Sequence, residues 1–272
     1  MKKTIDIKEL KKIQLGLLNA LDDYCVQNDL TYYLAYGTLI GAIRHKGYIP
    51  WDDDIDVMMP REDYNKFIAN FNNDKHASNL KAISHEIDTD YYLSFAKLIN
   101  KSNVMKEEVN IDYHIGVYID VFPLDNLADD YKVAKKRMKK AFRYNEILLL
   151  KNLTISKERV WYKNIMLGIG RLVSSFWTRD TLIDKLNSFG VHKKDDCFTE
   201  YIGTVTGIFV GNESRVFESK WFKDTVKDEF EGRDFIAPAG YDSLLRKLYG
   251  DYMKLPPIEE QTSHHAFNAW YN

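Results

Sequence analysis

The sequence predicts a mixed α/β fold, in which helices flank a sheet. Three observations lead there: helical and strand-like patterns alternate over about the first 125 residues, residues 129–188 are helical in pattern, and the last third combines short strands with one helix. At 272 residues and 45% apolar composition, the chain is long enough to bury a substantial core.

Each element of the first part has its own signal. Apolar side chains at helical spacing predict helices, and β-branched or aromatic runs predict strands. Gly37, Gly47 and Pro50 break the pattern between elements. The elements expected in order are a helix over 5–27, a strand over 31–36, a short helix over 39–45, a strand over 55–59, a helix through 64–71, and strands over 80–84, 92–99 and 115–122.

The remainder is predicted as a helical section followed by a mixed segment. Residues 161–177 form an amphipathic or core helix rather than a membrane span, because Lys163 and Arg171 interrupt the apolar run. The last third is expected to contain strands over 198–202 and 226–230 and a helix over 240–250. The chain thus divides into a core with the candidate site (1–128), a basic helical section (129–190) and a C-terminal mixed segment that packs back on the core (191–272).

Charge is distributed unevenly. The formal net charge is -2 with a pI of about 6.4, which argues against a nucleic-acid binder. Residues 131–163, here called the basic section, nevertheless carry eleven Lys or Arg against the two acids Glu146 and Glu158, a balance of +9. This section is either a solvated helix face or a peripheral contact with an anionic membrane.

The compartment follows from the cysteines and the N-terminus. Cys25 and Cys197 lie far apart without metal-type spacing, and nothing indicates a disulfide framework. The first residues, MKKTIDIKELKK, lack the unbroken apolar stretch of a signal peptide. A cytoplasmic protein is expected, peripheral at the inner face of the cell membrane if the basic section binds lipid.

A cluster of aspartates is the strongest functional signal. On a strand, Asp54 and Asp56 point to the same face, and such a pair usually binds a divalent cation, most often Mg²⁺ when phosphate supplies further ligands. A solvated acidic loop is the plain alternative. A calcium loop of the EF-hand type is disfavoured, since Val57 stands where glycine is required and Pro60 intrudes.

Asp120 is a candidate third carboxylate, because it lies inside an apolar strand where an unpaired charge is costly. A buried acid paired with a nearby Lys or Arg explains it equally well. Gly37 and Thr38 offer backbone N–H groups and a hydroxyl at a helix start, where a phosphate could dock.

Three stretches resemble the LicD family, whose relatives include the fukutin-type phosphotransferases. The first, YGTLIGAIRHKGYIPWDDDIDVMMPREDY, is similar to the family signature nearly position for position. The stretch VYIDVFPLDN and the C-terminal GYDSLLRKLYGDYMKLPP also match, so the resemblance spans most of residues 30–265. It implies a nucleotidyltransferase fold, and a bacterial enzyme that transfers phosphocholine from CDP-choline to a sugar of teichoic acid, lipopolysaccharide, capsule or another surface glycan.

The resemblance also assigns roles to residues. It implies that Asp54, Asp56 and Asp120, with Asp52 as an accompanying acid, hold one or two Mg²⁺ ions, for which Mn²⁺ can substitute. It also implies that Asp120 accepts the proton of the attacking sugar hydroxyl. Residues expected to bind substrate are Gly37, Thr38, Arg44, His45 and Lys97 at the phosphates and Trp51 at the choline cation.

Plain alternatives stand beside these roles. Lys97 is otherwise a surface charge, and Trp51 adjoins the aspartates by chance. His264 and His265 either reach the site or belong to a solvated tail.

Other functions remain open at this stage. The same fold can transfer ethanolamine phosphate or a polyol phosphate from its CDP derivative. A glycosyltransferase with an Asp-x-Asp pair is disfavoured, because only 53 residues precede Asp54, which leaves little room for a nucleotide-binding sheet. An inactive scaffold is a further alternative, although without a metal its carboxylate cluster would only destabilise the domain.

Overall fold

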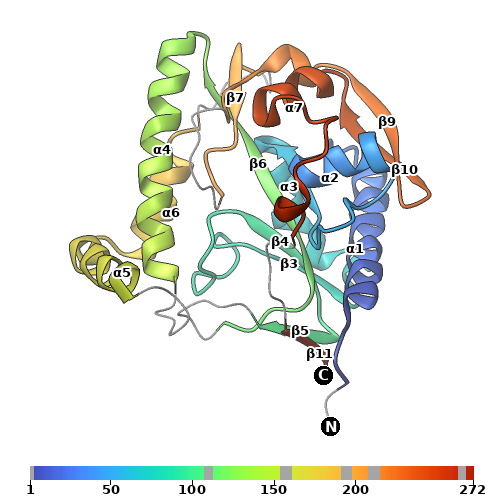
Figure 1. The fold of residues 1–272 in the computed structure, drawn as a ribbon, viewed down its shortest axis with the longest axis horizontal. Helices are drawn as coiled ribbons and strands as arrows, with labels where there is room; N and C mark the ends of the chain where they lie inside the picture. Colours follow the sequence, from blue (N-terminus) through green and yellow to red (C-terminus); the bar gives the residue numbers. More distant parts are fainter. Residues whose placement is uncertain (1–2, 107–112, 154–160, 191–197, 208–214, 263–267) are drawn as a thin grey trace.

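The computed structural model describes residues 3–106, 113–153, 161–190, 198–207, 215–262 and 268–272, and it confirms a mixed α/β fold (Figure 1). The main sheet has the strand order β1-β2-β6-β4-β3, and β7 and β8 extend it from β6. Its strands are β1 Tyr33–Leu34, β2 Asp56–Pro60, β3 Leu80–Ile83, β4 Ala96–Asn100, β6 Tyr118–Ala128, β7 Tyr201–Gly203 and β8 Phe217–Glu218.

Helices surround this sheet. In α1, the Asp6 side chain accepts a hydrogen bond from the Glu9 N–H (2.9 Å) and caps the first turn. Asp130 caps the first turn of α4 in the same way, accepting a hydrogen bond from the Val133 N–H (2.9 Å). The helices are α1 Ile7–Gln27, α2 Tyr36–Ile40, α3 Arg61–Asn70, α4 Tyr131–Asn152, α5 Trp161–Val173, α6 Arg179–Asn187 and α7 Tyr241–Tyr249, and a π-helical turn, Gly41–His45, continues α2.

Two small antiparallel pairs complete the fold. β9 Thr225–Phe230 pairs with β10 Arg233–Pro238, and β5 Asn103–Lys106 pairs with β11 Asn268–Tyr271 near the chain ends. The main core draws on both halves of the chain, since Leu21 and Phe67 share a cluster with Phe230 and Leu244. The C-terminal segment therefore contributes to the same core as the first 125 residues or so.

Parallel pairing of β2 and β6 sets up the site. Val57 faces Val121 across the two strands, and both side chains are fully buried. β4 lies antiparallel on the other side of β6, with Ala96 opposite Val121. Strands β2 and β6 thus begin side by side, and residues near their N-terminal ends are brought together.

Several predicted boundaries were wrong. The strand expected over 31–36 is short, because the chain turns into α2 at Tyr36, whose φ is +45°. The strand expected over 92–99 starts at Ala96, and that over 115–122 continues to Ala128. Strands β5, β8, β10 and β11 were not predicted.

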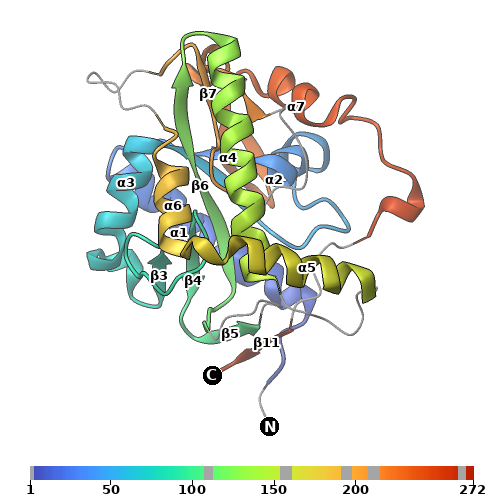
Figure 2. The same cartoon turned by 90° about the vertical axis from the view of Figure 1, so that its left-hand side faces the viewer.

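The predicted helical section forms α4, α5 and α6, with a smaller core of its own in which Met138 meets Ile183 and Leu186. Figure 2 shows α5 lying across the lower end of α4. No helix in the described part of the chain combines the length and apolarity needed to cross a bilayer. The boundaries at 128 and 190 stay predictions.

Candidate active site

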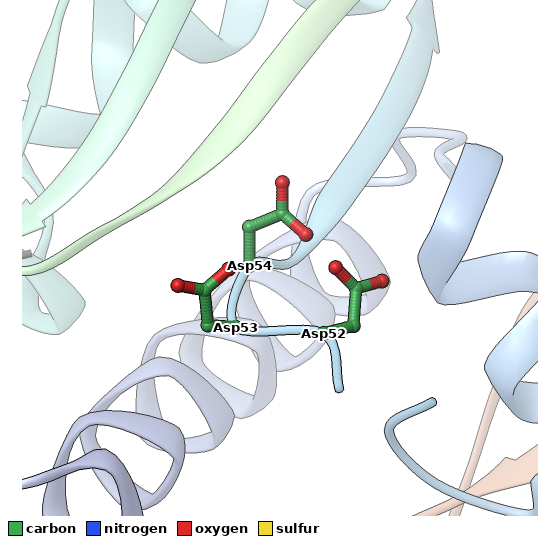
Figure 3. A group of neighbouring side chains, drawn as sticks. All are labelled: Asp52, Asp53 and Asp54. Carbon is green, nitrogen blue, oxygen red and sulfur yellow. The ribbon is translucent and has the colours of Figure 1, made fainter. Parts of the chain in front are cut away.

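The acidic segment leads directly into β2. Strand β2 begins at Asp56, so Asp54 precedes the strand rather than lying on it. Burial nevertheless alternates from residue to residue before the strand. Asp52, Asp54 and Asp56 are half-buried, whereas Asp53 and Ile55 are buried. One carboxylate oxygen each from Asp52, Asp53 and Asp54 lies within 4.8 Å of the others. In Figure 3 the side chains of Asp52 and Asp53 extend in the same direction from the segment, and that of Asp54 is seen between and above them.

Asp53 is the odd member of this group. It is only 5% exposed, and its carbonyl accepts a hydrogen bond from Gln14 Nε2 (2.9 Å) on α1. Close spacing alone would make Asp53 a metal ligand. The alternation of burial instead puts Asp52 and Asp54 on the side of Asp56, so we assign Asp53 to the packing of the segment against α1.

Asp120 lies directly beside Asp56. The two residues are partners in the parallel register of β2 and β6, and the Asp120 N–H donates to the Ile55 carbonyl (2.9 Å). Side chains in register on neighbouring strands point to the same face of the sheet. The structure therefore brings together the two carboxylates that lie 64 positions apart in the chain.

Lys97 joins the pair from β4. It stands opposite Asp120 in the antiparallel register, and its Nζ lies 2.8 Å from Asp120 Oδ1. The ammonium is also 3.2 Å from the centre of the Tyr118 ring. Lys97 is only 2% exposed, so the alternative that it is a surface charge was wrong. The alternative that a cation pairs with Asp120 is confirmed.

Gly37 and Thr38 brace the acidic segment from α2. The Asp56 N–H donates to Thr38 Oγ1 (2.9 Å), which fixes the start of β2. A Cβ added to Gly37 would lie 2.6 Å from Asp52 Oδ2, so only glycine allows Asp52 to approach this closely. The predicted Gly-Thr pair thus lies at the carboxylates.

Electrostatics in this cluster are unbalanced. Burial raises the pKa of Asp56 well above its usual value, and the charges of Asp54, Asp120 and Asp52 raise it further, while Lys97 opposes the shift. Burial lowers the pKa of Lys97, against the effect of Asp120. In the part of the chain that the structure describes, the carboxylates that act on Asp56 thus outweigh the Lys97 ammonium.

A divalent cation fits this donor set. Carboxylate oxygens are the ligands that Mg²⁺ and Mn²⁺ prefer, and a doubly charged ion would offset the excess negative charge. Such an ion would also act against the raised pKa of Asp56, because it favours the charged carboxylate.

Three residues that the sequence reasoning did not single out lie around the same place. The Tyr36 hydroxyl forms a hydrogen bond with Thr204 Oγ1 (2.8 Å). The guanidinium carbon of Arg215 lies 4.6 Å from the centre of the Tyr36 ring. Tyr249, at the end of α7, is 46% exposed, yet burial raises the pKa of its phenol, with Tyr36, Asp56 and Asp52 adding to the shift.

These residues had only weak signals in the sequence. Tyr36 and Tyr249 fall inside two of the quoted motifs, but nothing in the motifs separates them from other aromatic residues. Arg215 lies in no motif. The C-terminal third therefore reaches the carboxylates through contacts that the sequence does not reveal.

Comparison with known proteins now identifies the family. The chain is 30% identical over 273 residues to the lipopolysaccharide cholinephosphotransferase LicD of Haemophilus influenzae, across 98% of this chain and 99% of that protein. Residues 29–146 match the family model described as LicD/FKTN/FKRP, nucleotidyltransferase domain. The chain belongs to the LicD family. The resemblance seen in the motifs is confirmed.

Two shorter matches cover about a fifth of the chain each. An uncharacterized protein of Rickettsia typhi is 40% identical over 58 residues, which cover 21% of this chain and 19% of that protein. An uncharacterized protein of Rickettsia prowazekii is 35% identical over 69 residues, covering 22% and 26%. The range matched to the LicD model contains every predicted site residue from Gly37 to Asp120, whereas Arg215 and Tyr249 lie beyond it.

Arg44 and His45 of this LicD-family chain lie in the π-helical turn and contact the C-terminal segment. Arg44 Nη1 donates to the carbonyls of Tyr252 and, at 3.4 Å, Lys254, and its Nε donates to His45 Nε2 (2.9 Å). Burial and the Arg44 charge lower the pKa of His45, which suits an imidazole that accepts this bond. These contacts tie the chain after α7 to the turn. Binding of phosphate by either residue stays a prediction.

The remaining predictions have different outcomes. Trp51 is half-buried and packs against the main core, and a choline contact by its ring stays a prediction. His264 and His265 lie outside the described residues.

Proposed function

We propose that this chain transfers phosphocholine from CDP-choline to a sugar hydroxyl of a cell-surface glycan precursor in a reaction that needs Mg²⁺ or Mn²⁺. The observation that carries the proposal is the in-register Asp56–Asp120 pair, found in a chain that matches a lipopolysaccharide cholinephosphotransferase over nearly its full length. Lipopolysaccharide is the acceptor named for that relative, and teichoic acid and capsule precursors are related acceptor classes.

The carboxylates would hold the metal. Asp54, Asp56 and Asp120 are the proposed ligands, with Asp52 beside them. When bound, Mg²⁺ neutralises the diphosphate and stabilises charge on the leaving CMP. Thr38 Oγ1 already accepts the Asp56 N–H, so its own O–H remains to donate to a phosphate oxygen. The absence of a side chain at Gly37 leaves room for the Asp52 carboxylate beside α2.

The transfer step needs a proton acceptor. The sugar oxygen bonds to the phosphorus that carries choline, the bond from that phosphorus to the CMP oxygen breaks, and the sugar proton moves to a carboxylate. We assign that role to Asp120. Lys97, 2.8 Å from Asp120, holds this carboxylate in position and supplies positive charge where phosphate oxygens gather.

A peripheral position at the inner face of the membrane fits a lipid-linked acceptor. The basic section contributes the exposed side chains of Lys132, Lys136, Lys140 and Arg143 on α4. Anionic lipid headgroups attract such a helix face.

Donor choice is tested by thermal shift. The melting temperature is measured with CDP-choline, CDP-ethanolamine, CDP-ribitol and a UDP-sugar, each with and without Mg²⁺, on wild type, Asp56→Ala and the exposed control Asp234→Asn. We expect CDP-choline with Mg²⁺ to stabilise wild type and the control but not Asp56→Ala. Stabilisation by CDP-ethanolamine or CDP-ribitol alone would replace phosphocholine by that group. Stabilisation by the UDP-sugar alone would favour a glycosyltransferase.

A further inference from the structure

Helix α5 carries a stripe of exposed apolar side chains that the fold does not use. Ordinary globular helices bury their apolar stripe against the core, and a contiguous exposed one marks an interaction surface. Exposure rises along the stripe from 48% at its first member to 87% at its last. Its members, spaced three or four residues apart on one side of α5 and the turn after it, are Tyr162, Ile165, Ile169, Leu172 and Phe176.

The orientation of the stripe is fixed by the opposite side of α5. Leu167 is buried there, and Gly170 lies against Leu150 of α4. The Arg171 guanidinium donates to the carbonyls of Leu150 and Leu153 at the end of α4. Because this side is docked on α4, the stripe faces away from the protein. Figure 2 shows α5 crossing the end of α4 and projecting beyond it.

The charge around the stripe is of one sign. Between Glu158 and Asp180 the sequence contains no acid, but it contains Arg159, Lys163, Arg171 and Arg179. A second copy would carry the same positive charge in this stretch of sequence, which disfavours the pairing of two stripes. An anionic surface that also accepts apolar side chains complements both features.

We propose that α5 lies in the interface of an anionic phospholipid membrane and inserts this apolar stripe among the acyl chains. Helices with an apolar face in a positively charged stretch of chain bind bilayers in this way, and aromatic residues such as Tyr162, Phe176 and the neighbouring 37% exposed Trp177 suit the boundary with the headgroups. The basic section alone would give attraction that salt removes. The stripe adds a contact that salt does not remove.

The role of this membrane contact rests on the proposed function, because a lipid-linked glycan acceptor lies at a membrane surface. It does not depend on that function for its test. Binding to lipid and binding of nucleotide are separate measurements, so either can fail alone.

Vesicle flotation tests the proposal directly. The full chain is mixed with vesicles of phosphatidylglycerol and phosphatidylcholine, or of phosphatidylcholine alone, at low and high salt. The variants are Leu172→Ser with Phe176→Ser, and as matched control Val26→Ser, which changes a 71% exposed apolar residue on α1. We expect wild type and the control to float with the anionic vesicles and to retain part of their binding at high salt. The double variant should bind about tenfold or more weakly, because apolar burial is lost.

Three results would overturn the proposal. One is equal binding of the double variant and wild type. Another is wild-type binding that high salt abolishes, which would leave only the basic section in contact with lipid. The third is a wild-type dimer by light scattering that the double variant converts to monomer, which would assign the stripe to a second copy. The thermal shift with CDP-choline and Mg²⁺ should be the same in wild type and the double variant, so a failure of the donor proposal appears separately.

Discussion

Strands β2 and β6 carry charged residues at both of their ends, and the two ends differ in charge balance. At the N-terminal ends, Asp56 and Asp120 lie in register, Lys97 pairs with Asp120, and the charges of Asp54 and Asp52 add to the negative charge around Asp56. Just past the C-terminal end of the stretch where they pair, Arg61 Nε (2.7 Å) and Nη2 (2.9 Å) donate to the buried carboxylate of Asp125. A balanced pair of this kind serves the fold, whereas an unbalanced cluster costs stability unless a ligand compensates it.

The largest expected effect is on activity. Asp56→Asn removes a proposed metal ligand, and we expect the transfer rate to fall by about a thousandfold or more, because the metal supplies several kcal/mol of transition-state stabilisation. The melting temperature of the metal-free protein should stay the same or rise, since an uncompensated charge is removed. A rate within about tenfold of wild type, measured as CMP release, would contradict the assignment, and Asp234→Asn serves as the exposed control.

A change in the Arg61–Asp125 ion pair should lower stability instead of activity. Arg61→Met leaves Asp125 buried without its partner and should lower the free energy of unfolding by about 3–5 kcal/mol. The double variant Arg61→Met with Asp125→Leu should recover much of this loss. Chemical denaturation measures both. If Arg61→Met instead left stability unchanged and removed the Mg²⁺-dependent thermal shift, the comparison between the two ends would fail.

Two glycines test the same comparison between the two carboxylate sites, with smaller expected effects. A Cβ on Gly37 would lie 2.6 Å from Asp52 Oδ2, and a Cβ on Gly190 would lie 2.6 Å from Asp125 Oδ1. Each alanine variant must displace a carboxylate, at roughly 1–3 kcal/mol. We expect Gly37→Ala to weaken Mg²⁺ binding about tenfold and Gly190→Ala to lower the melting temperature without changing Mg²⁺ binding. Calorimetric titration with Mg²⁺ and a melting curve distinguish them, and the reverse pattern would contradict the account.

The smallest effect is a pH dependence. The pKa of Asp56 in the folded state lies above its unfolded value, so its charge destabilises the metal-free protein above that unfolded value, and this destabilisation is relieved as the pH falls through the folded pKa. Protons also compete with Mg²⁺ for the carboxylate. The rise in melting temperature on adding Mg²⁺ should therefore shrink as the pH is lowered. A shift that grows at lower pH would argue against Asp56 as a ligand.

The sequence predicts these two ends unequally. Asp56 and Asp120 stand out because each interrupts an apolar strand, and the expected strand over 55–59 matches β2 closely. The pairing register that puts them side by side is a tertiary property. Lys97 shows the same limit: an isolated lysine in a strand pattern reads as a surface charge until β4 is placed against β6.

The missed elements have a common physical cause. Strands β5 and β11 have four residues each and pair with each other across a long stretch of chain, so local propensity says little about them. Tyr36 takes a left-handed backbone that a tyrosine rarely adopts, and tertiary contacts with Thr204 and Phe122 accompany it. In long helices such as α1 and α4, the apolar periodicity that predicts the helix lies within the segment itself, so these helices were predicted well.

The most direct test of the central claim is a titration with Mn²⁺, followed by electron paramagnetic resonance, in the presence of CDP-choline. The account predicts tight Mn²⁺ binding by wild type and Asp234→Asn, and loss of that binding in both Asp56→Asn and Asp120→Asn. Binding of Mn²⁺ by Asp56→Asn with the same affinity as wild type would contradict the claim that the unbalanced end of β2 and β6 is a metal site.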